Sequence, residues 1–468
     1  LIQVTEDGGQ NWRSIDDLPG VPDRFFVNDI KADLHDPDTV YVVVDDHKNG
    51  DFSPYVLKSD NRGRSWESIS SNLPDRHILW RIVQDHEKPE LMFLGTEVGV
   101  FFTVDAGDTW TKLKGGSPNI PFRDLAIQTR ENDLVGATFG RSFYVLDDYS
   151  PLRQVTADML ANDTVLFPVR TTRWYVPKRP FGCSEAGCVG SQGDGYYLAQ
   201  NPPFGATFTY YLPNTDHSAR DARRETEKER EASNENVEFA PWDRILGELR
   251  EDDPAIVFVV RDGDGNVVRQ VAGPVEAGFQ RVAWDLRYPA VDAWIPEEER
   301  EAQWIPSAGV LVAPGRFTVS MHKRVDGVLT DLGQSQSFDV VSIREPTLPG
   351  STQEQRVVFE NQVDEMRRAT QGTIKTIDTI VTELVAAKEV LMSSTADPSL
   401  YEIANSIQQR VQVERDRLTD NETRAMFKDL DGMTVTARLS HARFRPQVSA
   451  YGPTPLQRES LRIARELF

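Results

Sequence analysis

Cysteine is nearly absent from this chain of 468 residues, which contains only Cys183 and Cys188 in the stretch FGCSEAGCVG. A structural zinc site needs four ligands, and no second Cys pair or His pair lies nearby in the sequence. The spacing leaves three interpretations open: a disulfide that closes a small loop in an oxidising compartment, two free thiols, or half of a metal site. We expect the disulfide, and neither a metal nor another cofactor.

Positive charge is also scarce, since 52 Lys and Arg residues stand against 73 Asp and Glu, for a net charge of −21. Nucleic acids and anionic membrane surfaces are bound through basic patches, so neither is an expected partner. No apolar run approaches the roughly 18 residues of a membrane span. The length is sufficient for about three domains with sizeable cores.

Recognisable catalytic motifs are missing as well. The sequence has no Gly-x-Ser-x-Gly elbow, no His-Glu-x-x-His pair and no phosphate loop, and only seven histidines. Acids are plentiful, but sequence spacing alone cannot pair two carboxylates across a sugar ring, as a glycosidase requires. Arg81, Arg123 and Arg141 lie in or just before expected strands, where we expect surface ion pairs. The catalytic residues, if there are any, stay unknown.

What the chain does contain is a repeat. In TEDGGQNW, SDNRGRSW and TVDAGDTW a Ser or Thr is followed by Asp or Asn two positions later, Gly four later and Trp seven later. The acid positions are 54 and 44 residues apart, as expected for units of four short strands. We call each copy an Asp-turn. Its residues are Thr5, Asp7, Gly9 and Trp12 in the first copy; Ser59, Asn61, Gly63 and Trp66 in the second; Thr103, Asp105, Gly107 and Trp110 in the third.

These residue types predict a structural role. The motif falls between the last two strands of each unit, where Asp accepts hydrogen bonds from turn amides and Gly supplies a positive φ. The Trp is expected to pack between neighbouring sheets. A fourth, degenerate copy runs from Leu134 to Leu152, with Asp147 at the acid position and no Trp.

The pattern Ser/Thr-x-Asp-x-Gly-x-Thr-Trp resembles the Asp-box, or BNR repeat, of sialidases, xyloglucanases and sortilin-type propellers. The stretches ATFGRSFYVLDDYSPLRQ, NPPFGATFTYYL and RVAWDLRYP look like a large group of secreted bacterial proteins labelled BNR-repeat glycosyl hydrolase or sortilin-like. The resemblance implies a β-propeller, then a β-sandwich and a helical tail, in an extracytoplasmic protein. It supplies no catalytic residue.

About three repeats are present, whereas closed propellers have roughly 4–8 blades. We therefore expect the chain to be the C-terminal portion of a longer protein. Its first partner would then be upstream propeller blades, supplied by the same protein or by a partner chain.

The rest of the chain changes character twice. β-rich segments resume after residue 151, interrupted by a charged insertion near 214–252 that is expected to be helical or mobile. Asp262, Asp264 and Asn266 match the first ligands of a calcium loop, but the flanking alternation favours a hairpin. Trp294 and Trp304 lie in an acidic loop and are expected to pin that loop to its own sheet rather than stack on a sugar.

After Pro349 the periodicity becomes helical. Ser351 with Glu354 three positions on predicts an N-cap with a capping box. A second, antiparallel helix is expected over 398–420 and a third over 453–468, since apolar residues recur there at helical spacing.

The predicted fold is therefore mainly β. Residues 1–150 are expected to form C-terminal blades of an Asp-box propeller, 151–345 an immunoglobulin- or fibronectin-like sandwich, and 350–468 a helical hairpin or small bundle. Two functions remain open. One is a secreted binding or assembly module for protein, peptide or glycan ligands. The other is a sialidase- or xyloglucanase-like glycoside hydrolase whose catalytic acids lie mostly upstream of this chain.

Overall fold

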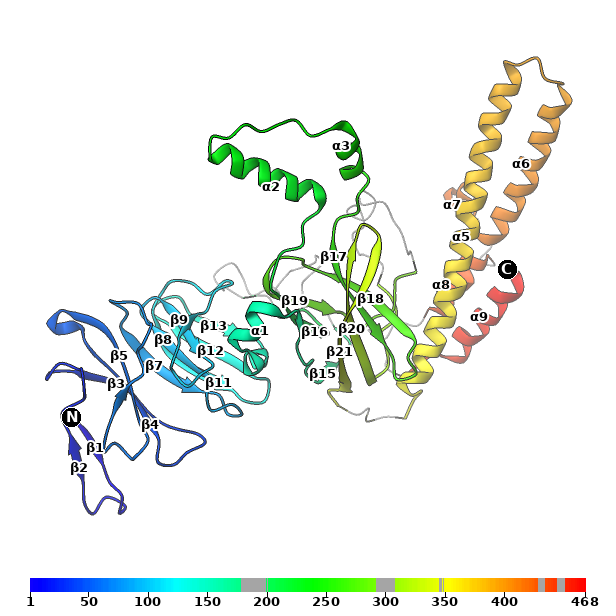
Figure 1. Cartoon of the computed structure of the whole chain (residues 1–468). Coiled ribbons are helices and arrows are strands. Elements are labelled where there is room, and N and C mark those ends of the chain that lie inside the picture. The colour runs from blue at the N-terminus through cyan, green and yellow to red at the C-terminus, as the bar shows by residue number, and fades with distance from the viewer. Residues whose placement is uncertain are drawn as a thin grey trace. The chain divides into compact units, whose positions relative to one another are not determined.

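The computed structural model describes residues 1–177, 199, 201–291, 308–344, 347, 349–427, 434–443 and 451–468. It divides into two compact units, Leu1–Phe167 and Pro168–Phe468. The prediction of a mainly β protein with C-terminal helices is confirmed (Figure 1). Cys183, Cys188, Trp294 and Trp304 lie outside the described residues.

The first unit consists of antiparallel sheets that follow one another along the chain, each formed by consecutive strands. The strands are β1 (Ile2–Val4) and β2 (Arg13–Ile15); β3 (Phe26–Ala32), β4 (Val40–Asp46), β5 (Asp51–Ser59) and β6 (Glu67–Ser68); β7 (Leu79–Gln84), β8 (Met92–Thr96), β9 (Gly99–Thr103) and β10 (Thr111–Lys112); β11 (Phe122–Gln128), β12 (Asp133–Thr138) and β13 (Phe143–Leu146). Short helices complete the unit: η1 (His47–Asn49), η2 (Ser150–Gln154) and α1 (Ala157–Asn162), followed by β14 (Val165–Leu166).

The core of this unit lies between successive sheets. The central strands are buried on both faces, which explains why β4 reads VYVVVDD without polar alternation. One apolar cluster joins β1–β2 to β3–β6, a second joins β3–β6 to β7–β10, and a third joins β7–β10 to β11–β13. Each sheet is thus stabilised by the next one rather than by a central core.

The second unit begins with two sheets. The strands are β15 (Thr172–Trp174), β16 (Ala206–Leu212), β17 (Ala255–Arg261), β18 (Val267–Gly273), β19 (Gly278–Trp284), β20 (Gly315–Val325) and β21 (Val328–Ser342). One sheet has the order β15-β21-β20-β17-β18, and β16 pairs with β19 in the other. Phe208 of β16 contacts Phe258 and Phe338 of the five-stranded sheet, so aromatic rings fill the space between the sheets.

Two sequence predictions concern this region. The hairpin over Asp262 is confirmed, because β17 and β18 pair on either side and Asp262 accepts from the amides of Asp264 and Asn266. The charged insertion contains α2 (Ala219–Ala232) and α3 (Trp242–Glu248). Arg223 of α2 and Glu248 of α3 join the two helices at 2.8 Å.

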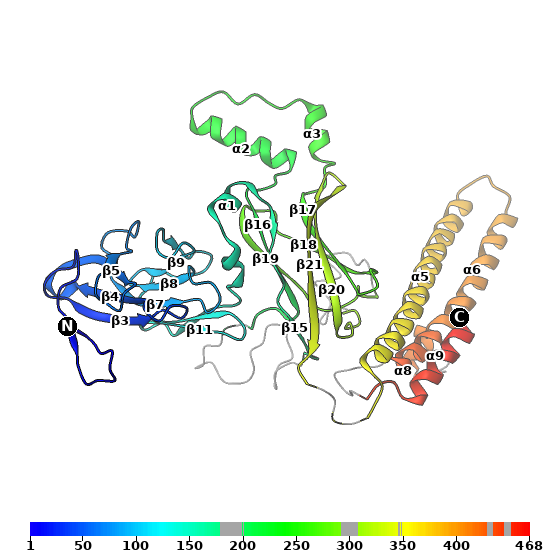
Figure 2. The ribbon, with the colours of Figure 1, turned by 60° about the horizontal axis from the view of Figure 1, so that its bottom comes forward.

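The C-terminal helices begin with a long hairpin (Figure 2). They are α5 (Gln353–Met392), α6 (Ser399–Leu418), α7 (Glu422–Met426), α8 (Val435–Ala442) and α9 (Pro455–Leu467). Phe359 and Val363 of α5 pack with Leu439 of α8 and Leu461 of α9 in one buried cluster.

The predicted cap of α5 is wrong by one residue. Thr352, not Ser351, is the N-cap, and its capping box is formed with Gln355 rather than Glu354. The backbone amide of Ser351 instead donates to the carbonyl of Tyr451 at 2.9 Å. That contact holds Ser351 outside the helix, so the second of two overlapping capping sequences is used.

Candidate functional site

In the first unit, the sheets β3–β6, β7–β10 and β11–β13 share an irregularity in their first strands, β3, β7 and β11. In each, the pairing with the second strand skips one residue, between Val27 and Asp29, between Leu79 and Arg81, and between Phe122 and Asp124. Such β-bulges re-aim side chains and are frequent beside functional sites. The skipped residues, Asn28, Trp80 and Arg123, are here called the bulge row.

The residue after each bulge belongs to a chain of ion pairs that crosses the three sheets. The guanidinium group of Arg81 lies 2.9 Å from the carboxylate of Asp29 and 2.6 Å from that of Asp124. Asp29 also accepts from the backbone amide of Ile82 at 3.0 Å. The hydrogen bond from Arg81 lowers the pKa of Asp124, and the pKa of Arg81 is raised in turn. The three strands are therefore tied together directly beneath the bulge row.

The bulge row itself carries aromatic and cationic groups. The guanidinium carbon of Arg123 lies 3.5 Å from the ring centroid of Trp80, a cation–π contact. The indole nitrogen of Trp80 donates to Glu97 at 2.8 Å, and Glu97 lies 3.6 Å from Arg123. The exposed ring of Phe139 also lies near Arg123, with 5.5 Å between the guanidinium carbon and the ring centroid.

The ion pair with Arg81 bears on the charge of Asp124. A glycosidase needs one carboxylic acid that stays protonated, with a raised pKa. The hydrogen bond from Arg81 instead lowers the pKa of Asp124, which favours its charged form. The expectation of surface ion pairs is confirmed for Arg81 and Arg123. Among the described residues Arg141, the third arginine of that expectation, forms no ion pair.

The Asp-turns lie elsewhere, at the connections β1–β2, β5–β6 and β9–β10. In the third copy Thr103 donates to Asp105 at 2.6 Å and accepts from the amide of Gly107 at 3.0 Å, while Asp105 accepts from the amide of Thr109 at 2.9 Å. The first copy repeats these bonds, with Thr5 accepting from Gly9 and Asp7 from Asn11. In the second copy Ser59 accepts from Gly63, and Asn61 from Ser65.

The turn geometry accounts for the residue types. Gly9, Gly63 and Gly107 have φ values of 93°, 73° and 100°, which residues with a side chain rarely adopt. The backbone hydrogen bond from Asn11 lowers the pKa of Asp7 to about 2. Burial raises the pKa of Asp105, but hydrogen bonds from Thr103 and Thr109 outweigh it and lower the pKa. Asp7 and Asp105 thus use their carboxylates in hydrogen bonds within their own turns.

The expected packing of the tryptophans between sheets is seen for Trp66 and Trp110 and is not tested for Trp12. Trp110 is 3% exposed in the cluster between two sheets, and Trp66 packs partly buried against the preceding cluster. Trp12 is 57% exposed, and its indole nitrogen donates to the carbonyl of Gly9 at 3.1 Å. Trp66 and Trp110 each pack toward the sheet before their own, and among the described residues no sheet precedes β1–β2.

Replacing Asp105 with alanine is expected to reduce the free energy of unfolding by about 1–3 kcal/mol, because the turn amides lose their acceptor. Asp108→Ala, at an exposed position on the same turn, is the matched control and should change stability by less than about 0.5 kcal/mol. Urea denaturation of the full chain measures both. Equal effects of the two substitutions would contradict a structural role for Asp105.

Comparison with known proteins gives little further information. No protein-family model and no curated protein matches the chain. Solved structures similar to it include the extracellular domain of a putative one-component system from B. thetaiotaomicron, at 10% identity and a TM-score of 0.20, covering 68% of this chain and 31% of that one. An ancestral GH74 enzyme matches at 11% identity and a TM-score of 0.21, covering 66% of this chain and 35% of the enzyme. The chain thus spans about a third of each, and a likeness this distant assigns neither family nor activity.

The described helices include none with the length and apolar run that crossing a bilayer requires. The bulge row was not predicted from sequence. Its residues have no common residue type, and the two intervals between them differ in length, so only the strand pairing reveals their equivalence.

Proposed function

We propose that this chain is an extracytoplasmic binding module that holds a protein or peptide ligand against the bulge row and does not transform it. In this proposal the sheets of residues 1–150 are blades of an Asp-box propeller, and β3, β7 and β11 are their innermost strands. Residues 151–345 form an immunoglobulin-like sandwich, and 350–468 form a helical tail.

The observation that carries the proposal is the coincidence of three bulges in equivalent strands, each aiming one side chain away from the regular pleat. A β-bulge interrupts the backbone hydrogen bonds between two strands. The stability of the sheets therefore does not require a bulge at the same position in three of them. The ion pairs of Arg81 with Asp29 and Asp124 support the row from beneath and fix its spacing.

The chemistry of the row favours a polypeptide over a glycan. Sugar rings stack on an open aromatic face, but one face of Trp80 is already covered by the guanidinium of Arg123. Tryptophan and arginine are the residues that most often dominate protein–protein binding energy. Glu97, Arg123 and the exposed ring of Phe139 together offer an acceptor, a donor and an apolar contact to a peptide.

The test is selection of peptide ligands from a display library on the intact chain, followed by calorimetric titration. Trp80→Ala and Arg123→Ala should each weaken binding by at least about thirtyfold, as expected for interface residues worth 2 kcal/mol or more. Arg130→Ala is the control, because Arg130 is exposed in the same unit and pairs with its neighbour Glu131. It should leave affinity unchanged.

Two results would refute this function. One is a set of selected ligands whose affinity does not depend on Trp80 or Arg123. The other is glycan hydrolysis by the purified chain that disappears in Asp29→Asn or Asp124→Asn, since that would make these carboxylates catalytic.

A further inference from the structure

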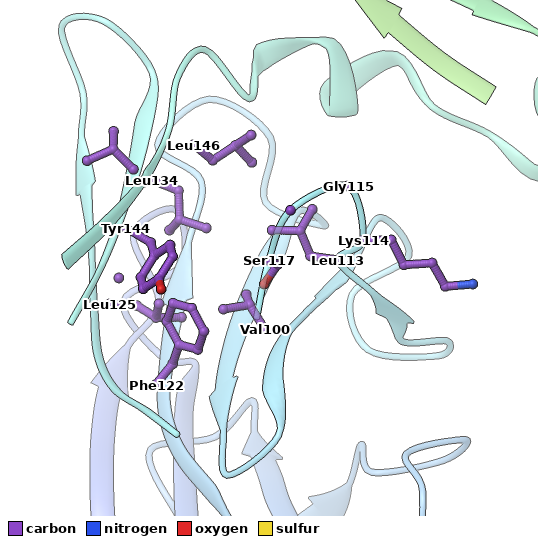
Figure 3. Close-up of a pocket in the computed structure, with 13 residues that line it drawn as sticks. Val100, Leu113, Lys114, Gly115, Ser117, Phe122, Leu125, Leu134, Tyr144 and Leu146 are labelled. Carbon is purple, nitrogen blue, oxygen red and sulfur yellow. The ribbon is translucent and has the colours of Figure 1, made fainter. Parts of the chain in front are cut away.

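Two hollows in the structure have mainly apolar linings. The first, of about 200 Å³, lies between the last two sheets of the first unit (Figure 3). Val100, Phe122 and Leu134 line it, each at most 3% exposed, and Leu152 packs against the same cluster. This hollow is therefore part of the core of that unit. The second hollow lies in the C-terminal helices, and its lining is largely exposed.

The second hollow is a groove of about 480 Å³ along the α5–α6 hairpin, whose two helices lie side by side in Figures 1 and 2. All of its lining residues are apolar. They are Leu384, Ala387, Val390 and Leu391 of α5 and Leu400, Ile403, Ala404 and Ile407 of α6. Val390 and Ile403 are 66% and 53% exposed, so the lining meets solvent. We call this surface the hairpin groove.

The distal part of the hairpin has almost no core of its own. Between Thr370 and Leu418, where the structure describes every residue, Ala404 is the only buried one. Two helices cover only one side of each other's apolar stripe, whereas a bundle of four helices encloses it. A continuous apolar surface that faces solvent marks an interaction site. The hairpin groove therefore has the composition of an interface between helices.

Two polar contacts define which residues of α5 and α6 stand at the same height. Arg415 lies 2.6 Å from Asp378, and the ammonium group of Lys388 donates to Asn405 at 3.3 Å. Ten residues separate the two contacts on each helix. Because both helices rise by the same amount per residue, the positions between the two contacts stay in step.

Glu383 and Arg410 lie midway between these contacts, one on each helix, and so stand at the same height. Glu383 precedes Ala387 of the groove by four residues, a spacing that shares a helix face. Arg410 follows Ile407 of the groove by three residues, which also share a face. Both charged side chains are exposed, and within the described ranges neither forms an ion pair. The groove thus has an unpaired acid on one rim and an unpaired base on the other.

These opposite charges suit a second copy of the chain. A two-fold axis along the hairpin places α5 of each copy beside α6 of the other, and every helix then has antiparallel neighbours, as in four-helix bundles with short loops. Such an axis preserves heights, so Glu383 of one copy meets Arg410 of the other, and the contact forms twice. Val390 of one copy likewise meets Ile403 of the other, since both lie two residues beyond the second polar contact.

We propose that two copies of this chain dimerise through the hairpin groove, with their hairpins pointing the same way, to form a four-helix bundle. The apolar linings pack in its core, and two ion pairs between Glu383 and Arg410 flank that core. The groove spans about two turns of each helix, so the dimer dissociates in the micromolar range. The hairpin groove and the bulge row lie in different units, so this association is independent of the proposed function.

Sedimentation velocity of the full chain, from about 1 to 300 µM in a reducing buffer, measures the dimer. Glu383→Arg and Arg410→Glu each place like charges opposite one another at both contacts, and each should weaken dimerisation at least about tenfold. An equimolar mixture of the two variants should regain the wild-type affinity, because the mixed dimer has opposite charges at both contacts. Glu389→Arg makes the same charge change at an exposed position of α5 that does not line the groove, and it should dimerise as the wild type does.

A second pair of variants tests the apolar lining. Val390→Gln removes an apolar contact from both copies and should weaken the dimer at least about tenfold. Val385→Gln is the matched control, because Val385 is 40% exposed on the same helix and does not line the groove. All the substituted side chains are exposed, so each variant should keep the circular dichroism and melting temperature of the wild type.

Three results would overturn the proposal. The first is a chain that stays monomeric up to about 300 µM. The second is a dimer that neither charge substitution weakens, or one that the mixture does not restore, since its helices would then be paired in another way. The third is equal dimerisation of the Val390→Gln and Val385→Gln chains, which would place the interface outside the groove.

Discussion

Substituting Asp85 with alanine is expected to lower the free energy of opening of the first unit by about 3–5 kcal/mol, because it removes the buried carboxylate that pairs with Arg153 and leaves the hydroxyl of Tyr149 without its acceptor. Asp85 is fully buried and accepts two hydrogen bonds from Arg153, both at 2.8 Å. It also accepts from the hydroxyl of buried Tyr149 at 2.7 Å and from the amide of Lys88 at 2.7 Å. The segment that ends the unit is thus anchored to the connection between β7 and β8.

Hydrogen exchange of the full chain, read on peptides that cover β8 and β9, measures this effect locally. Glu87→Ala is the control. Glu87 also contacts Arg153, at 2.8 Å, but its side chain is exposed, so its loss should cost less than about 1 kcal/mol. Similar effects of the two substitutions would mean that the buried network does not hold the unit together.

The same network predicts an acid-sensitive step. Burial raises the pKa of Asp85, but the bonds from Arg153 and Tyr149 outweigh it and hold the pKa at about 2. A carboxyl group whose pKa is lower in the folded state stabilises the fold above its unfolded pKa, about 3.9, and this contribution is lost as pH falls toward the folded pKa. We expect Asp85 to contribute about 2 kcal/mol that disappears between about pH 5 and 2. Urea midpoints of wild type and Asp85→Ala should converge over that range.

Gly205→Ala is expected to destabilise the second unit by more than about 3 kcal/mol, because the new methyl group has no space. A Cβ at this position would lie 1.9 Å from the carbonyl oxygen of Trp284, the buried residue at the end of β19. The backbone φ of 119° adds strain of its own. Trp284 packs against Phe317 between the sheets, so β19 cannot shift freely to make room.

Gly278→Ala separates the two causes. Gly278 stands at the other end of the same pair of strands, opposite Leu212, with φ of 101° and open space around its Cβ position. Gly278→Ala should therefore reduce the free energy of unfolding only through backbone strain, by about 1–3 kcal/mol. The additional loss of stability in Gly205→Ala then measures the steric clash. Melting of the full chain followed by circular dichroism compares the two. A Gly205→Ala chain as stable as Gly278→Ala would contradict the packing described for β16 and β19.

The spacing of the Asp-turns was enough to predict short strands at regular intervals. Each turn was recognisable because its hydrogen-bond donors and acceptors all lie within eight consecutive residues. The cap of α5 was not predictable to the residue. Ser351 with Glu354 and Thr352 with Gln355 satisfy the same local pattern, and a bond between Ser351 and Tyr451, distant in sequence, decides between them. Hydrogen bonds between neighbouring residues can be predicted from the sequence. Where two neighbouring residues could both cap a helix, tertiary contacts determine which one does.

The candidate site depends on tertiary contacts throughout. Arg81 meets Asp29 and Asp124 across 52 and 43 residues, and no local pattern marks the three as partners. The burial of Trp12 was also not predictable from its sequence neighbours. It has the same sequence neighbourhood as Trp110, yet one is exposed and the other buried, because burial depends on whether another sheet lies against the turn.

The measurement closest to the central claim is hydrogen exchange of the full chain with and without a peptide selected on it. Binding at the bulge row predicts slower exchange in peptides that cover β7 and β11, and unchanged exchange in the Asp-turn over Thr103–Trp110. Slower exchange confined to the Asp-turns, with β7 and β11 unaffected, would contradict the claim that the first strands form the binding surface.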